Sequence, residues 1–344
     1  MGIKQNIQFW KYPRLIQENQ SLLQERDLLQ CQRDSLNEQK EYLLQEKDKL
    51  IQEIEKLTQE NANLIEEKKI IFDKLSYLNL NLPDFSHISD SLLDIKTITN
   101  KARQFQIDLN NKKEELKTEK FDWYPYNTLT NFVTLEKLLT GENRFLLELI
   151  GDKPVIDIGC ADGDTAFFLE SIGCEVKVID FAPTNFNKLQ GVRLLKSALS
   201  SSVEIEELNL DEQFILPEKA YSLVFFLGTL YHLKNPFYAL NTLAKSAKYC
   251  LISTRIAKFN NAHGGSSDRT NISSIPMAYL LDDLEANNDS TNYWIFSDAG
   301  LRRILKRAGW EIRDYIKVGN TEDSDPASLE GDERAFCLVK SLLW

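Results

Sequence analysis

Hydrophobic residues recur every seven positions through the first quarter of the chain. The repeat consists of Leu15, Leu22, Leu29, Leu36, Leu43, Leu50, Leu57, Leu64 and Ile71. No glycine or proline lies between Pro13 and Pro83. A seven-residue repeat places its apolar members on one face of a long helix, and a partner helix must cover that face. We therefore predict a coiled coil over residues 13–82, preceded by a tail of residues 1–12.

The positions beside the leucine seam bear on the partner. With the leucines at heptad position d, most a positions are polar, among them Asn19, Arg26 and Lys40. Polar a positions fix the register and favour a parallel dimer. The neighbouring position carries the apolar residues Ile16, Leu23, Leu44, Ile51, Ile65 and Phe72. Antiparallel packing, or folding back onto the other domain, therefore stays open beside the parallel homodimer.

The hydrophobic pattern changes twice after Pro83. Residues 83–120 lose the seven-residue repeat and predict a connector with one more polar helix. From residue 121 the composition becomes aromatic and apolar, and short apolar runs alternate with helical patterns up to residue 344. This alternation is typical of an α/β fold with a doubly wound, Rossmann-like sheet. We expect residues 121–344 to form that domain.

Composition and charge narrow the classes of partner. The 344 residues carry a formal net charge of -11, which disfavours a large nucleic-acid surface without excluding nucleic acid. Five scattered cysteines form no C-x-x-C pair, so we expect a reducing compartment and no metal site. The first residues lack an apolar signal core, and no run of about 18 apolar residues occurs. We expect a soluble, cytoplasmic protein without a membrane span.

The stretch VIDIGCADGD carries the clearest chemical signal. Val155 to Ile158 is apolar enough for a central parallel strand, and Thr165 to Ser171 is apolar enough for the helix after it. Gly159 and Gly163 lie in the turn between them, where glycine lets the backbone approach a ligand that a Cβ would exclude. The dinucleotide pattern G-x-G-x-x-G lacks its second and third glycines here, so an NAD site is disfavoured.

The same turn resembles a known cofactor motif. The series Asp157, Gly159, Ala161 and Gly163 resembles the first motif of class I S-adenosylmethionine-dependent methyltransferases, with Ala161 in place of the usual middle glycine. The resemblance covers about residues 121–344 and none of the predicted coiled coil. It implies S-adenosylmethionine as the cofactor.

Further cofactor contacts are expected after the next strands. Asp180 ends the second strand, 21 residues beyond Gly159, where a carboxylate can accept both hydrogen bonds of a ribose diol. In the resembling family the polar residue after the third strand faces the adenine. Asn209 matches that place best, and Asp211 is the alternative. The implied cofactor site consists of Asp157, Gly159, Ala161, Gly163, Asp180, Phe181, Asn209, Leu210, Leu227 and Gly228.

The run LGTLYHLKNP, Leu227 to Pro236, resembles the fourth motif of these methyltransferases. It is most similar to the branch typified by the bacterial tRNA wobble-uridine carboxymethoxy-forming enzyme, a resemblance that places the methyl group beside this turn. Where the acceptor is a hydroxyl or a protonated amine, His232 is the candidate general base by position and titration range. A purely structural His232 is the alternative. Tyr231, Tyr126 and Asp122 are candidates to orient the acceptor.

Three functional hypotheses follow. The first is an S-adenosylmethionine-dependent methyltransferase that acts on a small molecule, a glycan or a lipid-linked saccharide, as a homodimer formed through the coiled coil. The second is a tRNA wobble-uridine methyltransferase, favoured by LYHLKNP and disfavoured by charge. The third is a coiled-coil scaffold with an inactive cofactor fold. The long segment from Ala257 to Phe296 is expected to recognise the acceptor.

Overall fold

The chain divides into two compact units, Met1–Phe85 and Ser86–Trp344. The computed structural model describes residues 93–117, 119–260, 269–283, 285, 289–326 and 332–344, together with separate positions between 23 and 56. Every described position between 23 and 56 is helical. The side chains of Leu29, Leu36 and Leu43 are 58%, 64% and 62% exposed. The rest of the predicted coiled coil, and the tail of residues 1–12, lie outside the described residues, so the coiled coil stays a prediction.

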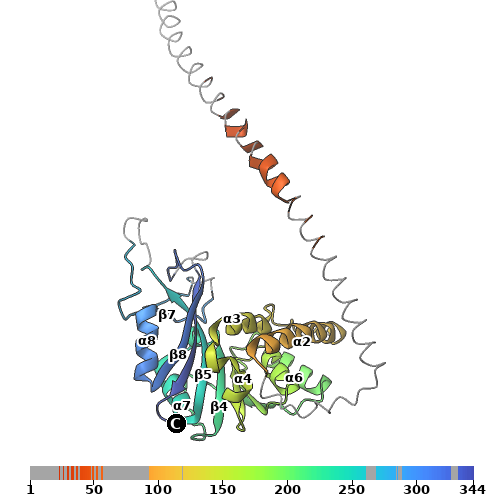
Figure 1. The fold of residues 1–344 in the computed structure, drawn as a ribbon, viewed down its shortest axis with the longest axis vertical. Helices are drawn as coiled ribbons and strands as arrows, with labels where there is room; N and C mark the ends of the chain where they lie inside the picture. Colours follow the sequence, from red (N-terminus) through yellow and green to blue (C-terminus); the bar gives the residue numbers. More distant parts are fainter. Residues whose placement is uncertain are drawn as a thin grey trace, which may run out of the picture. The chain divides into compact units, whose positions relative to one another are not determined.

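The second unit contains a nine-stranded mixed sheet (Figure 1). Its main strand order is β3-β2-β1-β4-β5-β7-β6, and β9 pairs with both β5 and β8. The strands are β1 (Val155–Ile158), β2 (Val176–Asp180), β3 (Glu204–Glu207), β4 (Tyr221–Leu227), β5 (Ala247–Ala257), β6 (Ala278–Leu280), β7 (Trp294–Ser297), β8 (Trp310–Gly319) and β9 (Glu333–Ser341). Strands β1 to β5 are parallel, whereas β9 runs antiparallel to β5 and β8. The predicted parallel, Rossmann-like centre is confirmed.

Helices cover both faces of the sheet. They are α2 (Ile95–Glu115), α3 (Asn131–Leu138), α4 (Leu146–Ile150), α5 (Asp164–Ser171), α6 (Gln190–Ala198), α7 (Pro236–Ser246) and α8 (Asp298–Arg307). Short 3-10 helices η3 (Thr128–Thr130), η4 (Gly141–Arg144) and η5 (Leu230–His232) complete the set of described elements. Helix α8 is capped by Ser297, the residue before it, whose side chain accepts a hydrogen bond from the Gly300 amide.

Alternate residues of the central strands enter two different cores. Leu223 and Phe225 of β4 pack with α2 to α6 on one face. Val224 and Phe226 pack with α7 and α8 on the other. Because both of its faces are buried, β4 has a nearly continuous apolar sequence.

Helix α2 belongs to the domain although its sequence looks like that of a connector. Ile95, Ile98 and Leu109 are buried in the same core as α3 and α5. The domain therefore starts well before residue 121, where the sequence analysis placed its boundary. The difference has a physical cause: α2 buries a narrow stripe that also contains the polar residues Gln106 and Lys113, so its apolar signal is weak.

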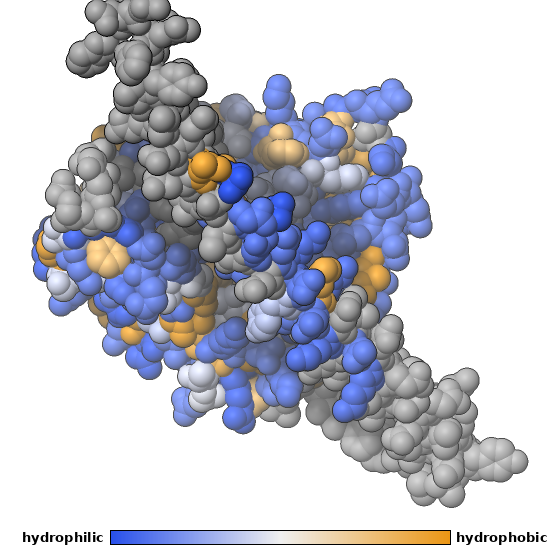
Figure 2. Space-filling view, turned by 90° about the horizontal axis from the view of Figure 1, so that it is seen from above, coloured by the Kyte–Doolittle hydropathy of each residue, from blue (hydrophilic) through white to orange (hydrophobic). Residues whose placement is uncertain are grey.

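Figure 2 shows a face whose coloured surface is mostly hydrophilic, with hydrophobic residues in small, separate patches. Among the described residues, no helix is long and apolar enough to cross a membrane.

Candidate active site

The candidate site lies at the carboxyl ends of β1, β2 and β4. Strand β1 is hydrogen-bonded to β2 on one side and to β4 on the other. The chain crosses from one half of the sheet to the other between these strands, and in doubly wound sheets ligands bind outside the strand ends at this position.

The loop after β1 needs unusual backbone conformations. Gly159, Ala161 and Gly163 have φ values of 70°, 53° and 88°. A Cβ at Gly159 would overlap the Thr229 side chain, and one at Gly163 would overlap Val192 and Phe167. The sequence analysis expected these glycines to make room for a ligand. The structure corrects that reason, because the space beside both glycines is filled by neighbouring side chains.

Asp157 is a buried carboxylate with an open acceptor atom. The residue is 6% exposed, and its Oδ2 has no hydrogen-bond partner within the described part of the chain. Burial, followed by the nearby Asp180 and Asp164, raises the pKa of Asp157 to about 7. A buried carboxylate of this kind is stabilised by a cationic hydrogen-bond donor. The ammonium group of S-adenosylmethionine fits this requirement.

Asp180 lies where the resemblance predicts it, at the end of β2. Its carboxylate accepts hydrogen bonds from the Phe181 amide at 2.7 Å, from Asn185 Nδ2 at 2.9 Å and from Cys160 Sγ at 3.5 Å. Asn185 Nδ2 also donates to the Ala161 carbonyl at 3.1 Å. Asn185 thus connects the end of β2 to the loop after β1 that contains Gly159 and Gly163, called the glycine loop below. A carboxylate has about four acceptor positions, so three partners leave room for a ribose hydroxyl.

The segment after β3 distinguishes the two candidates for adenine recognition. The Asp211 carboxylate accepts the backbone N–H groups of Lys234 and Asn235, at 2.6 and 3.1 Å, and so holds the turn before α7. Asn209 makes only local contacts, with the Asp211 amide and with Glu212. Leu210, the residue between Asn209 and Asp211, is buried. Asn209 therefore remains the better candidate.

The turn after β4 is fastened to both neighbouring strands. Gly228, at φ 80°, donates its amide to the Ser253 carbonyl of β5 at 2.9 Å. Thr229 Oγ1 donates to the Ile158 carbonyl of β1 at 3.2 Å. Leu227 to His232 are consequently held next to the glycine loop, and the two motifs found in the sequence lie at one edge of the sheet.

His232 is fixed through one of its two ring nitrogens. Nδ1 lies 3.1 Å from the Thr291 carbonyl oxygen and 2.9 Å from Thr291 Oγ1. Burial lowers the pKa of His232, and the nearby Asp289 carboxylate opposes that shift. The imidazole is therefore neutral near pH 7, which is the form that a general base requires.

Tyr231 contacts His232 and also Arg334, which the sequence analysis did not identify. Its ring lies 4.2 Å from that of His232, and its hydroxyl is 3.4 Å from Arg334 Nη2. Arg334 and Arg255, neighbours on β9 and β5, both pair with Asp332. No local motif marks these residues, because strand pairing over a long stretch of sequence brings them together.

Two tyrosines lie in the segment between α2 and η3. Burial, followed by the neighbouring Tyr231, raises the pKa of Tyr124 to about 12. Tyr126 is 70% exposed and packs edge-on against Tyr124, with 5.4 Å between ring centroids. In the described structure Tyr126 makes no hydrogen bond or ring contact with Tyr231 or His232. Tyr124, which the sequence analysis did not choose, interacts electrostatically with Tyr231.

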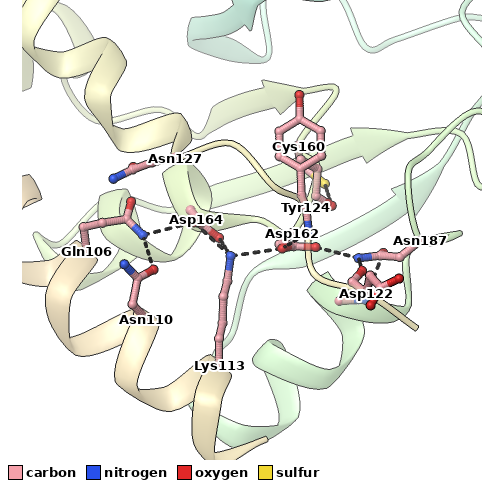
Figure 3. A network of polar contacts seen from close by, with 12 residues as sticks. Gln106, Asn110, Lys113, Asp122, Tyr124, Asn127, Cys160, Asp162, Asp164 and Asn187 are labelled. Atoms are coloured by element: carbon pink, nitrogen blue, oxygen red, sulfur yellow. Dashed lines mark hydrogen bonds and ion pairs between the residues drawn. The ribbon is translucent and has the colours of Figure 1, made fainter. Parts of the chain in front are cut away.

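A buried polar network supports the glycine loop from below (Figure 3). Lys113 Nζ of α2 lies 3.0 Å from Asp162 Oδ2 and 2.8 Å from Asp164 Oδ1. Asp162 also accepts the Tyr124 amide at 2.9 Å and Asn187 Nδ2 at 2.7 Å. Asn187 Nδ2 reaches the Asp122 carbonyl as well, at 3.3 Å, so Asp122 contributes its backbone here. Figure 3 shows the Tyr124 ring projecting away from this network.

The family follows from a comparison of the sequence. A family profile described as a methyltransferase domain matches residues 135–315, more than half of the chain. The chain therefore belongs to this methyltransferase family. Its cofactor is S-adenosylmethionine. The profile does not distinguish the tRNA wobble-uridine branch.

Solved structures give more distant likenesses. The N-terminal domain of EvdMO1 with S-adenosylhomocysteine bound shares 14% identity over 73% of this chain and 98% of its own, with a TM-score of 0.42. A Mesorhizobium loti S-adenosylmethionine-dependent methyltransferase shares 15% identity over 56% and 92%, with a TM-score of 0.39. Burkholderia thailandensis 1,6-didemethyltoxoflavin-N1-methyltransferase shares 19% over 55% and 72%, with a TM-score of 0.37. A search of curated proteins found no match. The family assignment rests on the profile alone.

Proposed function

We propose that the protein is an S-adenosylmethionine-dependent methyltransferase that acts on a small molecule, a glycan or a lipid-linked saccharide. One observation carries the proposal. Asp157 and Asp180 lie at the carboxyl ends of β1 and β2, and the turn containing His232 follows the neighbouring strand β4, so all three belong to the same edge of the sheet. A cation site, a diol site and a neutral base are the groups that such a reaction uses.

Each residue has an assigned role. Asp157 would bind the donor's ammonium group, Asp180 the ribose diol, and Asn209 with Leu210 the adenine. When bound, S-adenosylmethionine supplies a methyl group on a sulfonium, which is already activated for in-line displacement. The protein then has to hold the acceptor at attack distance beside Leu227 and Gly228 and remove its proton.

The acceptor class is supported by charge and by the insertion after β5. The net charge of -11 disfavours a long nucleic-acid ligand. The insertion contains the described aromatic residues Tyr279, Tyr293 and Trp294, of which Tyr293 donates its amide to the Tyr231 carbonyl at 2.8 Å. The acceptor-side aromatic residues are thereby joined to the turn that carries His232.

Donor binding can be tested by titrating the full chain with S-adenosylhomocysteine in a calorimeter. We expect Asp180→Ala to weaken binding by about 10- to 100-fold, the loss of one to two charged hydrogen bonds. Glu311→Ala is the matched control, because this exposed carboxylate on β8 forms an ion pair with the nearby Arg313 and with no other residue that the structure describes. A wild-type chain that bound neither S-adenosylmethionine nor S-adenosylhomocysteine would support the inactive scaffold instead.

The acceptor class can be tested with methyl-labelled S-adenosylmethionine and separated cell fractions. We expect label in the small-molecule or the lipid and glycan fraction. Label in tRNA would reject the proposed acceptor class. It would favour the wobble-uridine alternative, which the LYHLKNP motif supports. An active-site variant, His232→Gln, shows which labelled product depends on this site.

A further inference from the structure

The hydrogen bonds around His232 determine which of its nitrogens carries the proton. Thr291 Oγ1 lies 2.6 Å from Asp289 Oδ1, and this carboxylate oxygen also accepts the Thr291 amide at 2.9 Å. A carboxylate only accepts, so the single hydroxyl proton of Thr291 is donated to Asp289. Towards His232, the Thr291 hydroxyl can then act only as an acceptor.

The second contact of Nδ1 leads to the same result. The Thr291 carbonyl oxygen, 3.1 Å from Nδ1, has no proton to give. Both neighbours of Nδ1 are therefore acceptors, and Nδ1 must be the protonated nitrogen. In a neutral imidazole the lone pair then resides on Nε2. Nε2 forms no hydrogen bond with any described residue. It is the ring nitrogen that does not face Thr291.

The charged groups around His232 agree with a neutral ring. Burial disfavours the imidazolium most strongly, the Asp289 carboxylate favours it, and the Arg334 guanidinium disfavours it. Asp289 does not touch the ring and acts through the Thr291 hydroxyl. The arrangement resembles other sites in which a carboxylate fixes the tautomer of a base through the nitrogen that does not react.

We propose that Thr291 and Asp289 are positioning residues that hold the Nε2 lone pair of His232 ready for an acceptor hydroxyl, so that the enzyme methylates an alcohol or phenol oxygen. This inference rests on the proposed methyltransferase function. The acceptor proton passes to Nε2 while the oxygen forms its bond to the methyl carbon. The carbon–sulfur bond of the donor breaks, and its electron pair stays on sulfur. The imidazolium afterwards releases its proton to solvent.

The chemistry of other acceptors explains the choice of a hydroxyl. A protonated amine can lose its proton to water before it binds, and the neutral amine then attacks with its own lone pair; a carboxylate is already an anion near pH 7. An alcohol or phenol keeps its proton at that pH and becomes a competent nucleophile only as the proton leaves. A base whose tautomer is fixed by two supporting residues therefore matches a hydroxyl best.

The tautomer can be measured without knowledge of the acceptor. The chain has three histidines, so ¹⁵N-histidine labelling gives a simple spectrum, and His232→Gln assigns the signals. With S-adenosylhomocysteine added at pH 7, we expect a neutral His232 protonated at Nδ1. Asp289→Ala frees the Thr291 proton and should populate the form protonated at Nε2. A wild-type ring protonated at Nε2, or a tautomer unchanged in Asp289→Ala, would overturn the proposal.

Activity tests the positioning role. Thr291→Val keeps the shape and should lower methyl transfer into the small-molecule fraction by about tenfold or more, with unchanged S-adenosylhomocysteine affinity. Thr291→Ser should restore it. Thr130→Val is the control, because the exposed Thr130 hydroxyl donates to the Asn127 carbonyl and bonds no other residue in the described ranges. Full activity in Thr291→Val would contradict the positioning role.

The transferred atom type tests the substrate class. With methyl-¹³C S-adenosylmethionine, the carbon shift of the product shows whether the methyl is bound to oxygen, nitrogen, sulfur or carbon. We expect oxygen, and any other atom would overturn the proposed acceptor class. A complete lack of labelled product in every fraction would reject the proposed function, while the tautomer measurement would still decide the roles of Thr291 and Asp289.

Discussion

The buried carboxylate of Asp157, whose Oδ2 is unpaired among the described residues, lowers the stability of the free protein. The same lack of a partner in the described structure favours the binding of a cation beside it. Its pKa rises from an ordinary 3.8 to about 7, so the folded state holds a proton that the unfolded chain releases. The contribution of Asp157 to stability therefore falls as pH rises from about 4 to about 7. A donor ammonium group would recover part of this energy on binding.

We expect Asp157→Asn to raise the free energy of unfolding at pH 8 by roughly 1–3 kcal/mol. A shift of about three pKa units sets an upper limit near about 4 kcal/mol, and the unpaired amide lowers the gain. The gain should vanish at pH 4, and affinity for S-adenosylmethionine should fall. Urea denaturation at both pH values measures it, with the exposed Asp152→Asn as control. Equal stability at pH 8 would show that Asp157 is already paired.

At the scale of elements, α2 is coupled to the cofactor loop through one buried lysine. Lys113 is 8% exposed and faces two carboxylates that flank Gly163. Burial raises the pKa of Asp164, and Lys113 opposes the shift. The helix therefore supplies the charge that allows the loop to keep both acids buried.

The neighbouring residues Lys112 and Lys113 offer a matched comparison. Lys113→Met leaves two buried carboxylates without their cation, and we expect a loss of about 3–5 kcal/mol at pH 7. Lys112 pairs with Glu115 at the surface, so Lys112→Met should cost less than about 1 kcal/mol. Thermal unfolding compares the two. The Lys113→Met deficit should shrink at low pH, where the carboxylates become protonated; a deficit that persists unchanged would argue for lost packing instead.

At the scale of the whole molecule, the exposed heptad leucines favour association with another helix. Leu29, Leu36 and Leu43 belong to helical positions and are more than half exposed. A solvated leucine seam of this kind is buried in coiled coils. We propose that two copies of the chain associate through it.

Light scattering on the full chain tests the dimer. We expect the wild-type chain to have twice the monomer mass. The double variant Leu29→Glu and Leu36→Glu should have the monomer mass, because burying a charge at a d position without a compensating opposite charge is unfavourable. The control combines Gln45→Glu and Gln52→Glu, which lie at heptad position f outside the seam. A monomeric wild-type chain would reject the homodimer.

The sequence predicts the centre of the fold well and its periphery less well. Strand β1 has the predicted bounds, β2 ends at Asp180 as predicted, and α5 begins one residue earlier than predicted. A buried parallel strand followed by a glycine turn has a strong local pattern. The sequence did not predict that α2 packs in the core, because the apolar stripe of this helix is weak. Lys113 and Arg334 were missed because their partners lie far away in sequence. The side chains of Thr291 and Asp289 belong to a segment without a motif.

The position of β9 affects how the site is assembled. This strand is the last in the chain, yet it lies between β5 and β8 and pairs with both. During synthesis, β5 leaves the ribosome long before β9, so the edge of β5 that will pair with β9 presents unpaired backbone groups in the meantime. Arg334 reaches Tyr231 only when β9 has been inserted. The contact of Arg334 with Tyr231, on the acceptor side of the site, thus forms only after β9 has been synthesised and paired.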